Sequence, residues 1–188
     1  MSHIPIASHQ LFETNDLDEA RQRVGELFCR HQIRYSGKGR SLAFRQSFTP
    51  MTRMALSYVT YGEDVEIDAG EPENWFMVHS TLRGRCAMRV GRKEVCGDPE
   101  TEVVSSATLG LRMNWSADCG QMVLKVDRAA LERQLRRLLD DDIRRPLEFH
   151  PEVARSPGSG YRRLLTFIAS ETEQVDTFFQ SAIGHRPL

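Results

Sequence analysis

Six histidines and four cysteines are the side chains of this chain best suited to metal binding or nucleophilic chemistry. The histidines are scattered along the sequence, and His79 is the only one inside a predicted strand. An open catalytic metal site needs about three protein ligands, so one imidazole cannot hold an ion. The cysteines show no C-x-x-C pair. The sequence therefore predicts neither a metal nor another cofactor.

Motifs of nucleophilic or phosphate chemistry are missing from the sequence. It has no G-x-S-x-G and no H-E-x-x-H, and Gly37-Lys38-Gly39 lacks the Lys-Ser/Thr of a phosphate-binding loop. We therefore predict that the chain is not an enzyme. A metal-dependent enzyme of the cupin type is the alternative, and it requires a ligand cluster that the sequence does not reveal.

Cys86 and Cys96 flank a predicted hairpin around Gly91-Arg92. A two-residue turn places Cys96 opposite Ala87, whereas a three-residue loop would bring the two thiols face to face. Free thiols are the prediction, and a redox switch is the alternative. Free thiols and the missing signal peptide together predict a cytoplasmic protein.

Aromatic and methionine side chains on the predicted strands suggest a pocket for a small molecule. His79, Arg112 and Gln46 are candidates for its orienting polar groups. The alternative is a filled barrel, since eight-stranded barrels can be only wide enough for their own side chains. The candidate pocket residues are Phe44, Tyr58, Trp75, Met77, His79, Met113 and Trp115.

Short segments with period-2 alternation fill residues 42–126 and predict roughly eight strands. Their turn spacing favours a sandwich or small barrel. Trp75, Met77 and His79 share one strand face, but both faces of that strand are apolar. The predicted fold class is mainly β with flanking helices: a cupin-like antiparallel β-barrel or jelly roll.

Three helices are predicted around this barrel, at about 16–31, 128–139 and 160–179. Asp16, with Glu19 three residues on, forms a capping box, and Asp127 caps the second helix. Residues 1–14 are predicted to be an arm or a short edge strand, and 15–188 one regulatory domain. A leucine stripe on the second helix predicts a homodimer; its residues are Leu131, Leu135 and Leu138. The apolar face of the last helix is an alternative dimer contact, and packing on the barrel is the alternative for either helix.

The charge pattern argues against a nucleic-acid surface. The net charge is -1, and the arginines that follow residue 132 are interleaved with acidic residues, which is typical of an ion-paired, solvated face. No apolar run approaches the ~18 residues of a membrane span. We therefore expect that this chain contacts no membrane and does not itself bind DNA.

Several segments resemble the N-terminal cupin-like sensor domains of AraC/XylS-type transcriptional regulators. They include ETNDLDEARQRVGELFCRHQ, MALSYVTYGEDVEI, FMVHSTLRGRCAM, and WSADCGQMVLKVDRAALERQLRRLL followed by PLEFHP. The last run is the most specific, because it joins a particular hairpin to a particular helix. The resemblance covers about positions 10 to 185.

The resemblance implies a domain that senses a small-molecule effector and mediates dimerisation. In that family a separate domain with two helix-turn-helix units binds DNA, and we find no such segment after Leu139. Contact with DNA is therefore expected only through a missing C-terminal domain. A packed barrel that serves only for dimerisation is a further alternative.

Overall fold

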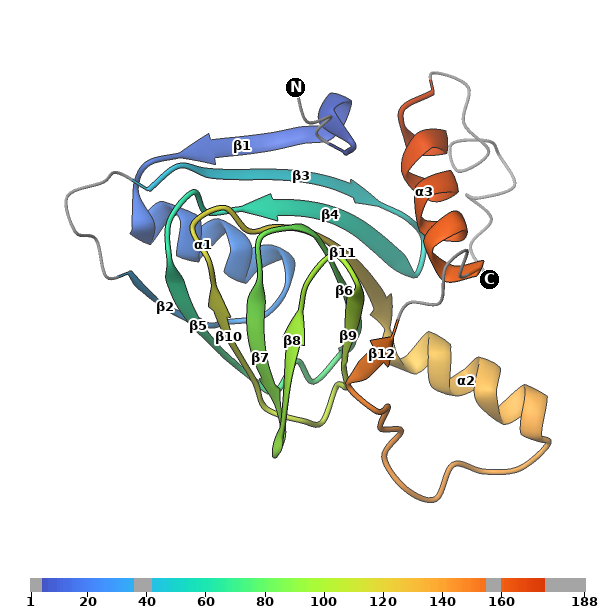
Figure 1. Ribbon diagram of the computed structural model, residues 1–188. Helices are drawn as coiled ribbons and strands as arrows, with labels where there is room; N and C mark the ends of the chain where they lie inside the picture. The colour runs from blue at the N-terminus through green and yellow to red at the C-terminus, as the bar shows by residue number, and fades with distance from the viewer. Residues whose placement is uncertain (1–4, 36–41, 155–159, 175–188) are drawn as a thin grey trace.

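The chain folds into two antiparallel sheets that face each other, in a computed structural model that describes residues 5–35, 42–154 and 160–174. Figure 1 shows the sheets curving around a common interior, with helices on the outside. This arrangement is a cupin-like jelly roll and confirms the predicted fold class.

One sheet has seven strands and the other has five. The seven-stranded sheet has the order β1 (Gln10–Thr14), β3 (Phe44–Pro50), β4 (Met54–Thr60), β11 (Gly120–Asp127), β6 (Trp75–Arg83), β9 (Thr101–Ser105) and β12 (Glu152–Ala154). The five-stranded sheet has the order β2 (Gln32–Tyr35), β5 (Val65–Gly70), β10 (Leu111–Trp115), β7 (Cys86–Val90) and β8 (Lys93–Gly97). A 3₁₀ turn, η1 (Ala7–His9), precedes β1.

The main core lies between the two sheets and follows the alternation of the strands. On β10, Leu111, Met113 and Trp115 are buried in it, while Arg112 and Asn114 are exposed. The β7–β8 register places Ala87 opposite Cys96, as the two-residue turn predicts, and Cys86 and Cys96 are free thiols.

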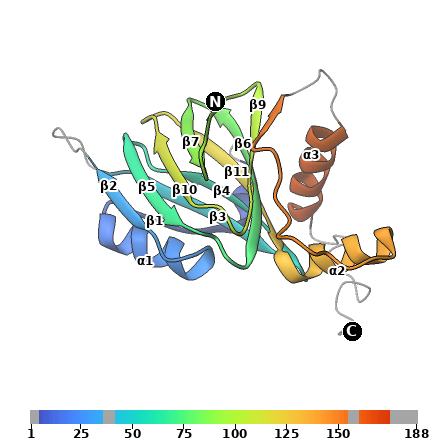
Figure 2. The same ribbon diagram turned by 90° about the horizontal axis from the view of Figure 1, so that it is seen from below.

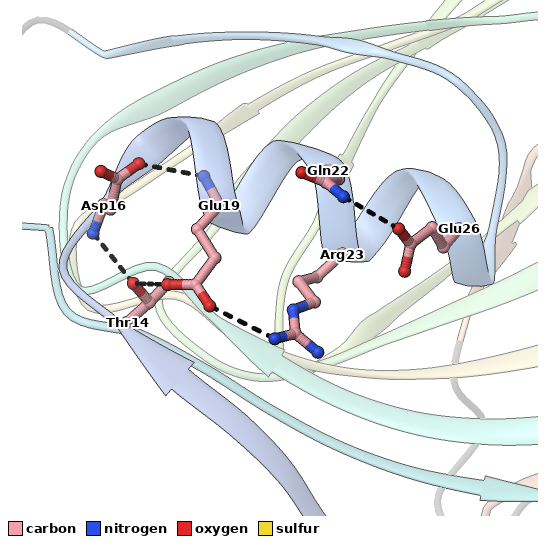
Figure 3. A network of polar contacts seen from close by, with 6 residues as sticks. All are labelled: Thr14, Asp16, Glu19, Gln22, Arg23 and Glu26. Atoms are coloured by element: carbon pink, nitrogen blue, oxygen red, sulfur yellow. Dashed lines mark hydrogen bonds and ion pairs between the residues drawn. The ribbon is translucent and has the colours of Figure 1, made fainter.

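Asp16 caps the start of helix α1 (Leu17–Leu27). Its carboxylate accepts hydrogen bonds from the backbone N–H groups of Asp18 and Glu19 at 2.8 and 3.0 Å. In the predicted capping box, the Glu19 carboxylate would accept a hydrogen bond directly from the Asp16 N–H. In the structure the two are linked through Thr14 (Figure 3). The Asp16 N–H donates to Thr14 Oγ1 at 3.1 Å, and that hydroxyl donates to Glu19 Oε2 at 2.6 Å. Figure 3 also shows Arg23 beside Glu19, at 3.5 Å, and Glu26, which accepts a hydrogen bond from Gln22 Nε2 at 3.2 Å. Arg23 and Glu26 are exposed.

The first helix ends at Leu27 and not near residue 31, because the chain turns there into β2, a strand that was not predicted. Helix α1 buries Ala20 and Val24 in the core between the sheets. It runs beside β1 and β2 and covers the interior on that side (Figures 1 and 2).

The other two helices differ in what they cover. In α3 (Gly160–Thr172), Leu165 and Ile168 are buried on the outer face of the seven-stranded sheet. Helix α2 (Arg128–Leu139) follows β11 directly, has no buried residue, and projects away from the barrel (Figure 1). Its predicted bounds are confirmed. Helix α3 ends at Thr172, where Glu173 and Gln174 form a turn, so it is shorter than predicted; residues 175–179 of that prediction lie outside the described residues.

None of the helices in the described parts of the chain has the length and apolar character that crossing a bilayer requires.

Candidate ligand-binding cavity

A cavity of about 60 Å³ lies between the two sheets. Its walls are mostly apolar side chains from both sheets, among them Val59, Ile67 and Leu111. One side is formed by Val24 of α1 and by the segment 28–31, which links α1 to β2. Helix α1 therefore forms part of the cavity wall.

Four predicted pocket residues line this cavity: Met77, His79, Met113 and Trp115. On β6 the predicted strand phase is confirmed, because Met77 and His79 face the interior while Val78 and Leu82 pack with the outer cluster under α3. The outer face of β6 is apolar as well, because it is covered by α3.

Two other predicted pocket residues lie in or near the core but not on the cavity wall. Phe44 is buried between Phe12 and Tyr61, with ring centroids 5.1 and 5.0 Å away. Trp75 is partly buried at the start of β6 and packs against the main core. Their contacts are with neighbouring side chains.

The expectation that Tyr58 faces the barrel interior is wrong. Tyr58 is buried in the outer cluster with Met122, Leu165 and Ile168, beneath α3. Strand β4 is apolar on both faces, so alternation alone did not tell which face would be covered by a helix.

Arg112 and Gln46, the other two polar groups that were predicted to orient a ligand, lie elsewhere in the fold. Arg112 lies on the exposed face of the five-stranded sheet, where its Nε is 2.9 Å from Asp68 Oδ2. Gln46 is buried on β3 and donates through Nε2 to Ser57 Oγ at 3.1 Å, away from the cavity wall. Neither side chain is among those that line the cavity.

Two histidines, His79 and His31, are among the residues that line the cavity. His79 Nε2 is 3.1 Å from Ser105 Oγ. Burial lowers the pKa of His79 to about 4, against a smaller opposite effect of the nearby Gln121 side chain. Burial also lowers the pKa of His31, and the hydrogen bond with the Cys29 carbonyl opposes it. Both rings are neutral at pH 7.

The buried His79 predicts a loss of stability in mild acid. The unfolded chain takes up a proton near pH 6.5, whereas the folded protein resists it down to about pH 4. The free energy of unfolding should therefore fall by roughly 2 kcal/mol from this group between pH 7 and pH 5. Urea titrations of wild type and His79→Gln at both pH values measure it. A variant that loses as much stability as wild type over this range contradicts the prediction.

The sequence reasoning missed Lys125, which lies beside the cavity. Its ammonium is 3.9 Å from the centroid of the Trp75 ring and donates to the carbonyl of Leu27, the last residue of α1. Burial lowers the pKa of Lys125, and Cys29 opposes this effect. The signal was available, because Lys125 lies two residues beyond Val123 and so shares its inward face.

Across residues 5–35, 42–154 and 160–174, the structure brings no three His, Cys, Asp or Glu side chains together in an arrangement suited to a metal ion. His79 is paired with a serine hydroxyl, as described above.

The pattern for the AraC-binding-like domain matches residues 20–186, which is most of the chain. The chain belongs to this family. The match includes most of α1, every strand except β1, and helices α2 and α3, so the AraC-binding-like domain is the unit that carries the cavity. The resemblance noted in the sequence is thereby confirmed.

A curated relative of this AraC-binding-like domain is the probable thc operon regulatory protein of Rhodococcus erythropolis. It is 26% identical over 167 residues, which are 87% of this chain and 50% of the relative. The chain thus spans about half the length of that protein.

The solved structure of one transcriptional activator shares this fold. The AraC-like transcriptional activator CuxR matches with a TM-score of 0.53 at 14% identity, over 68% of this chain and 51% of CuxR. The cupin domain of Schizosaccharomyces pombe Cnp3 matches with a TM-score of 0.40 at 10% identity, over 50% of this chain and 70% of that domain. The likeness to CuxR shows a shared fold alone. At 14% identity it gives no information about which ligand this chain binds.

Proposed function

We propose that this AraC-binding-like domain senses a small-molecule effector in the cavity between its sheets and holds two copies of the regulator together. The observation that carries the sensing role is the cavity between the sheets, whose wall is mostly apolar and includes His31, His79 and Trp115. Sites for small molecules are typically apolar cavities with a few polar residues in their lining.

The same cavity supplies a route from ligand to the outside of the domain. The segment 28–31 and Val24 form part of its wall, and Lys125 holds the end of α1 through the Leu27 carbonyl. A ligand that fits one position of this segment better than another shifts the population of α1 positions. In a longer regulator, this shift would reach an attached DNA-binding domain, through which alone the protein would contact DNA.

Helix α2 supports the dimerisation role. Leu131 and Leu135 are half-buried, Leu138 is 73% exposed, and nothing in the described part of the chain covers the end of the stripe. By contrast, Leu165 and Ile168 of α3 are buried on the barrel. A second copy of α2 would remove these leucines from water on both protomers.

A packed barrel that only dimerises is the second candidate, and the cavity volume favours it. About 60 Å³ is far below the ~300 Å³ or more of a pocket for drug-sized ligands. The sensing role therefore requires either a very small effector or movement of the 28–31 segment.

Thermal-shift screening against a metabolite library tests the sensing role. A ligand at ~100 times its dissociation constant should stabilise the domain by about 2.7 kcal/mol. Ala69 lines the cavity, so Ala69→Val fills it and should abolish the shift. Ala87→Val is the matched control, because Ala87 is exposed on the outer face of β7. A library without any binder, or a shift that Ala69→Val leaves intact, sides with the packed barrel.

A further inference from the structure

We propose that Lys125 couples the cavity to helix α2, as a positioning residue that contacts the end of α1 and the strand end beside the start of α2. This inference rests on the proposed sensing role and adds the route along which a change at the cavity wall reaches the outside of the domain. It follows from the contacts of one buried ammonium group.

The side chain of Lys125 is held inside the barrel. It is 6% exposed, and it shares the inward face of β11 with Val123, which lines the cavity. Burying an ammonium is unfavourable unless other contacts replace its water. Here it donates to the carbonyl of Leu27, the last residue of α1, where the helix dipole places partial negative charge. Lys125 thus ties the end of α1 to β11.

Three aromatic rings also contact the Lys125 ammonium. Its Nζ is 3.9 Å from the ring centroid of Trp75, 5.4 Å from that of Phe28 and 5.9 Å from that of Phe48. A cation is attracted to the face of an aromatic ring at such distances. The rings come from the first residue of β6, from the connection after α1 and from β3. The ammonium therefore joins parts of the chain that are far apart in sequence.

On one side of Lys125 is the wall of the cavity. Phe28, Cys29 and His31 line the cavity, and Leu27 immediately precedes them. A change in the cavity that displaces this segment moves the Leu27 carbonyl and the Phe28 ring relative to the ammonium. The buried charge then loses part of what compensates its burial, so the Lys125 side chain has to follow the segment.

On the other side is the first turn of α2, which is fixed to the strand end that carries Trp75. Trp75 lies opposite Asp127 in the register of β6 and β11, and the Arg128 N–H donates to the Asn74 carbonyl at 2.9 Å. Asp127 in turn caps α2 by accepting from the Ala130 N–H at 2.7 Å. A displacement of Trp75 therefore reaches the start of α2.

A double-mutant cycle followed by ¹H–¹⁵N NMR tests this coupling without a ligand. Ala69→Val enlarges a side chain that lines the cavity. The reporters are the indole N–H groups of the two tryptophans, Trp75 and Trp115, and the backbone N–H of Ala130 in ¹⁵N-alanine-labelled protein. In the wild-type background we expect Ala69→Val to shift all three peaks. In a Lys125→Met background it should still shift the Trp115 peak, from the cavity, and no longer shift the Ala130 peak.

Two exposed residues provide matched controls. Lys93→Met removes an exposed ammonium on β8 and should leave the response to Ala69→Val as in wild type. Ala87→Val, on the outer face of β7, should leave the Ala130 peak in place. Trp75→Leu cuts the same route on the α2 side and should also abolish the Ala130 response, so it decides the question if Lys125→Met does not fold.

An Ala130 response of equal size with and without the Lys125 ammonium would overturn the inference, because the residue would then serve stability alone. An Ala130 peak that Ala69→Val leaves in place in the wild-type background would overturn it as well. Neither result touches the sensing role, which the metabolite screen decides. An empty screen together with an Ala130 response that depends on Lys125 supports the coupling and overturns the sensing role.

Discussion

The double substitution Leu135→Glu with Leu138→Glu is expected to convert a dimeric domain into a folded monomer. These side chains continue the stripe of α2, and Leu138 is 73% exposed in the single chain. Burying one leucine contributes about 1.5–3 kcal/mol, and a two-fold interface buries each of them twice. Buried glutamates would also repel each other. We expect the dissociation constant to rise at least about 10³-fold, or roughly 4 kcal/mol, by analytical ultracentrifugation.

The matched control for this dimer is on α3. Leu164 and Phe167 are each 53% exposed, and they flank the buried Leu165. Replacing both by Glu changes a comparable apolar patch on the other helix and should leave the dimer intact. A wild-type monomer, or dissociation by the α3 variant alone, contradicts the assignment of the interface to α2.

Phe44→Ala is expected to destabilise the domain by about 3–5 kcal/mol, the usual cost of truncating a buried phenylalanine. Phe44 is 1% exposed and stands second in a row of aromatic rings formed by Phe12, Phe44, Tyr61 and Trp115. Its loss removes ring contacts on both sides and leaves a cavity. Urea unfolding followed by circular dichroism measures the change.

Two further variants separate the packing role of Phe44 from a role in ligand binding. Phe44→Leu should cost much less stability and leave ligand binding unchanged, because Phe44 does not line the cavity. Phe167→Ala, at an exposed site, should stay within about 0.5 kcal/mol of wild type. A cost below about 1 kcal/mol for Phe44→Ala would contradict the packing described here.

Local signals in the sequence were enough for much of the fold. Asp127 accepts a hydrogen bond from the Ala130 N–H at 2.7 Å and starts α2 where a carboxylate before helix-forming residues predicts it. The two-residue turn at Gly91-Arg92 set the register that separates Cys86 from Cys96. Each of these features is fixed by residues a few positions apart.

Features that depend on distant residues were harder to predict. Tyr58 was assigned to the interior, but both faces of β4 are apolar, and only the docking of α3 decides between them. Strand β2 was missed because Gln32–Tyr35 is short, and it is a strand only through pairing with β5. Strand phase places Lys125 on the inward face, but its contacts with the end of α1 and with Trp75 depend on distant parts of the chain.

Only part of the candidate site could be predicted from the sequence. Strand phase identified Met77, His79, Met113 and Trp115, which come from two strands with clear alternation. It could not identify His31, because this residue reaches the wall through the turn between α1 and β2. This part of the cavity wall thus comes from a connection whose path depends on tertiary packing.

A crystal structure of the domain with the strongest binder from the metabolite screen tests the central claim most directly. The account predicts ligand density between the two sheets, in contact with Trp115 and His31, and a shifted 28–31 segment if the ligand exceeds the cavity. Ligand density outside the barrel, with the interior unchanged, would contradict it.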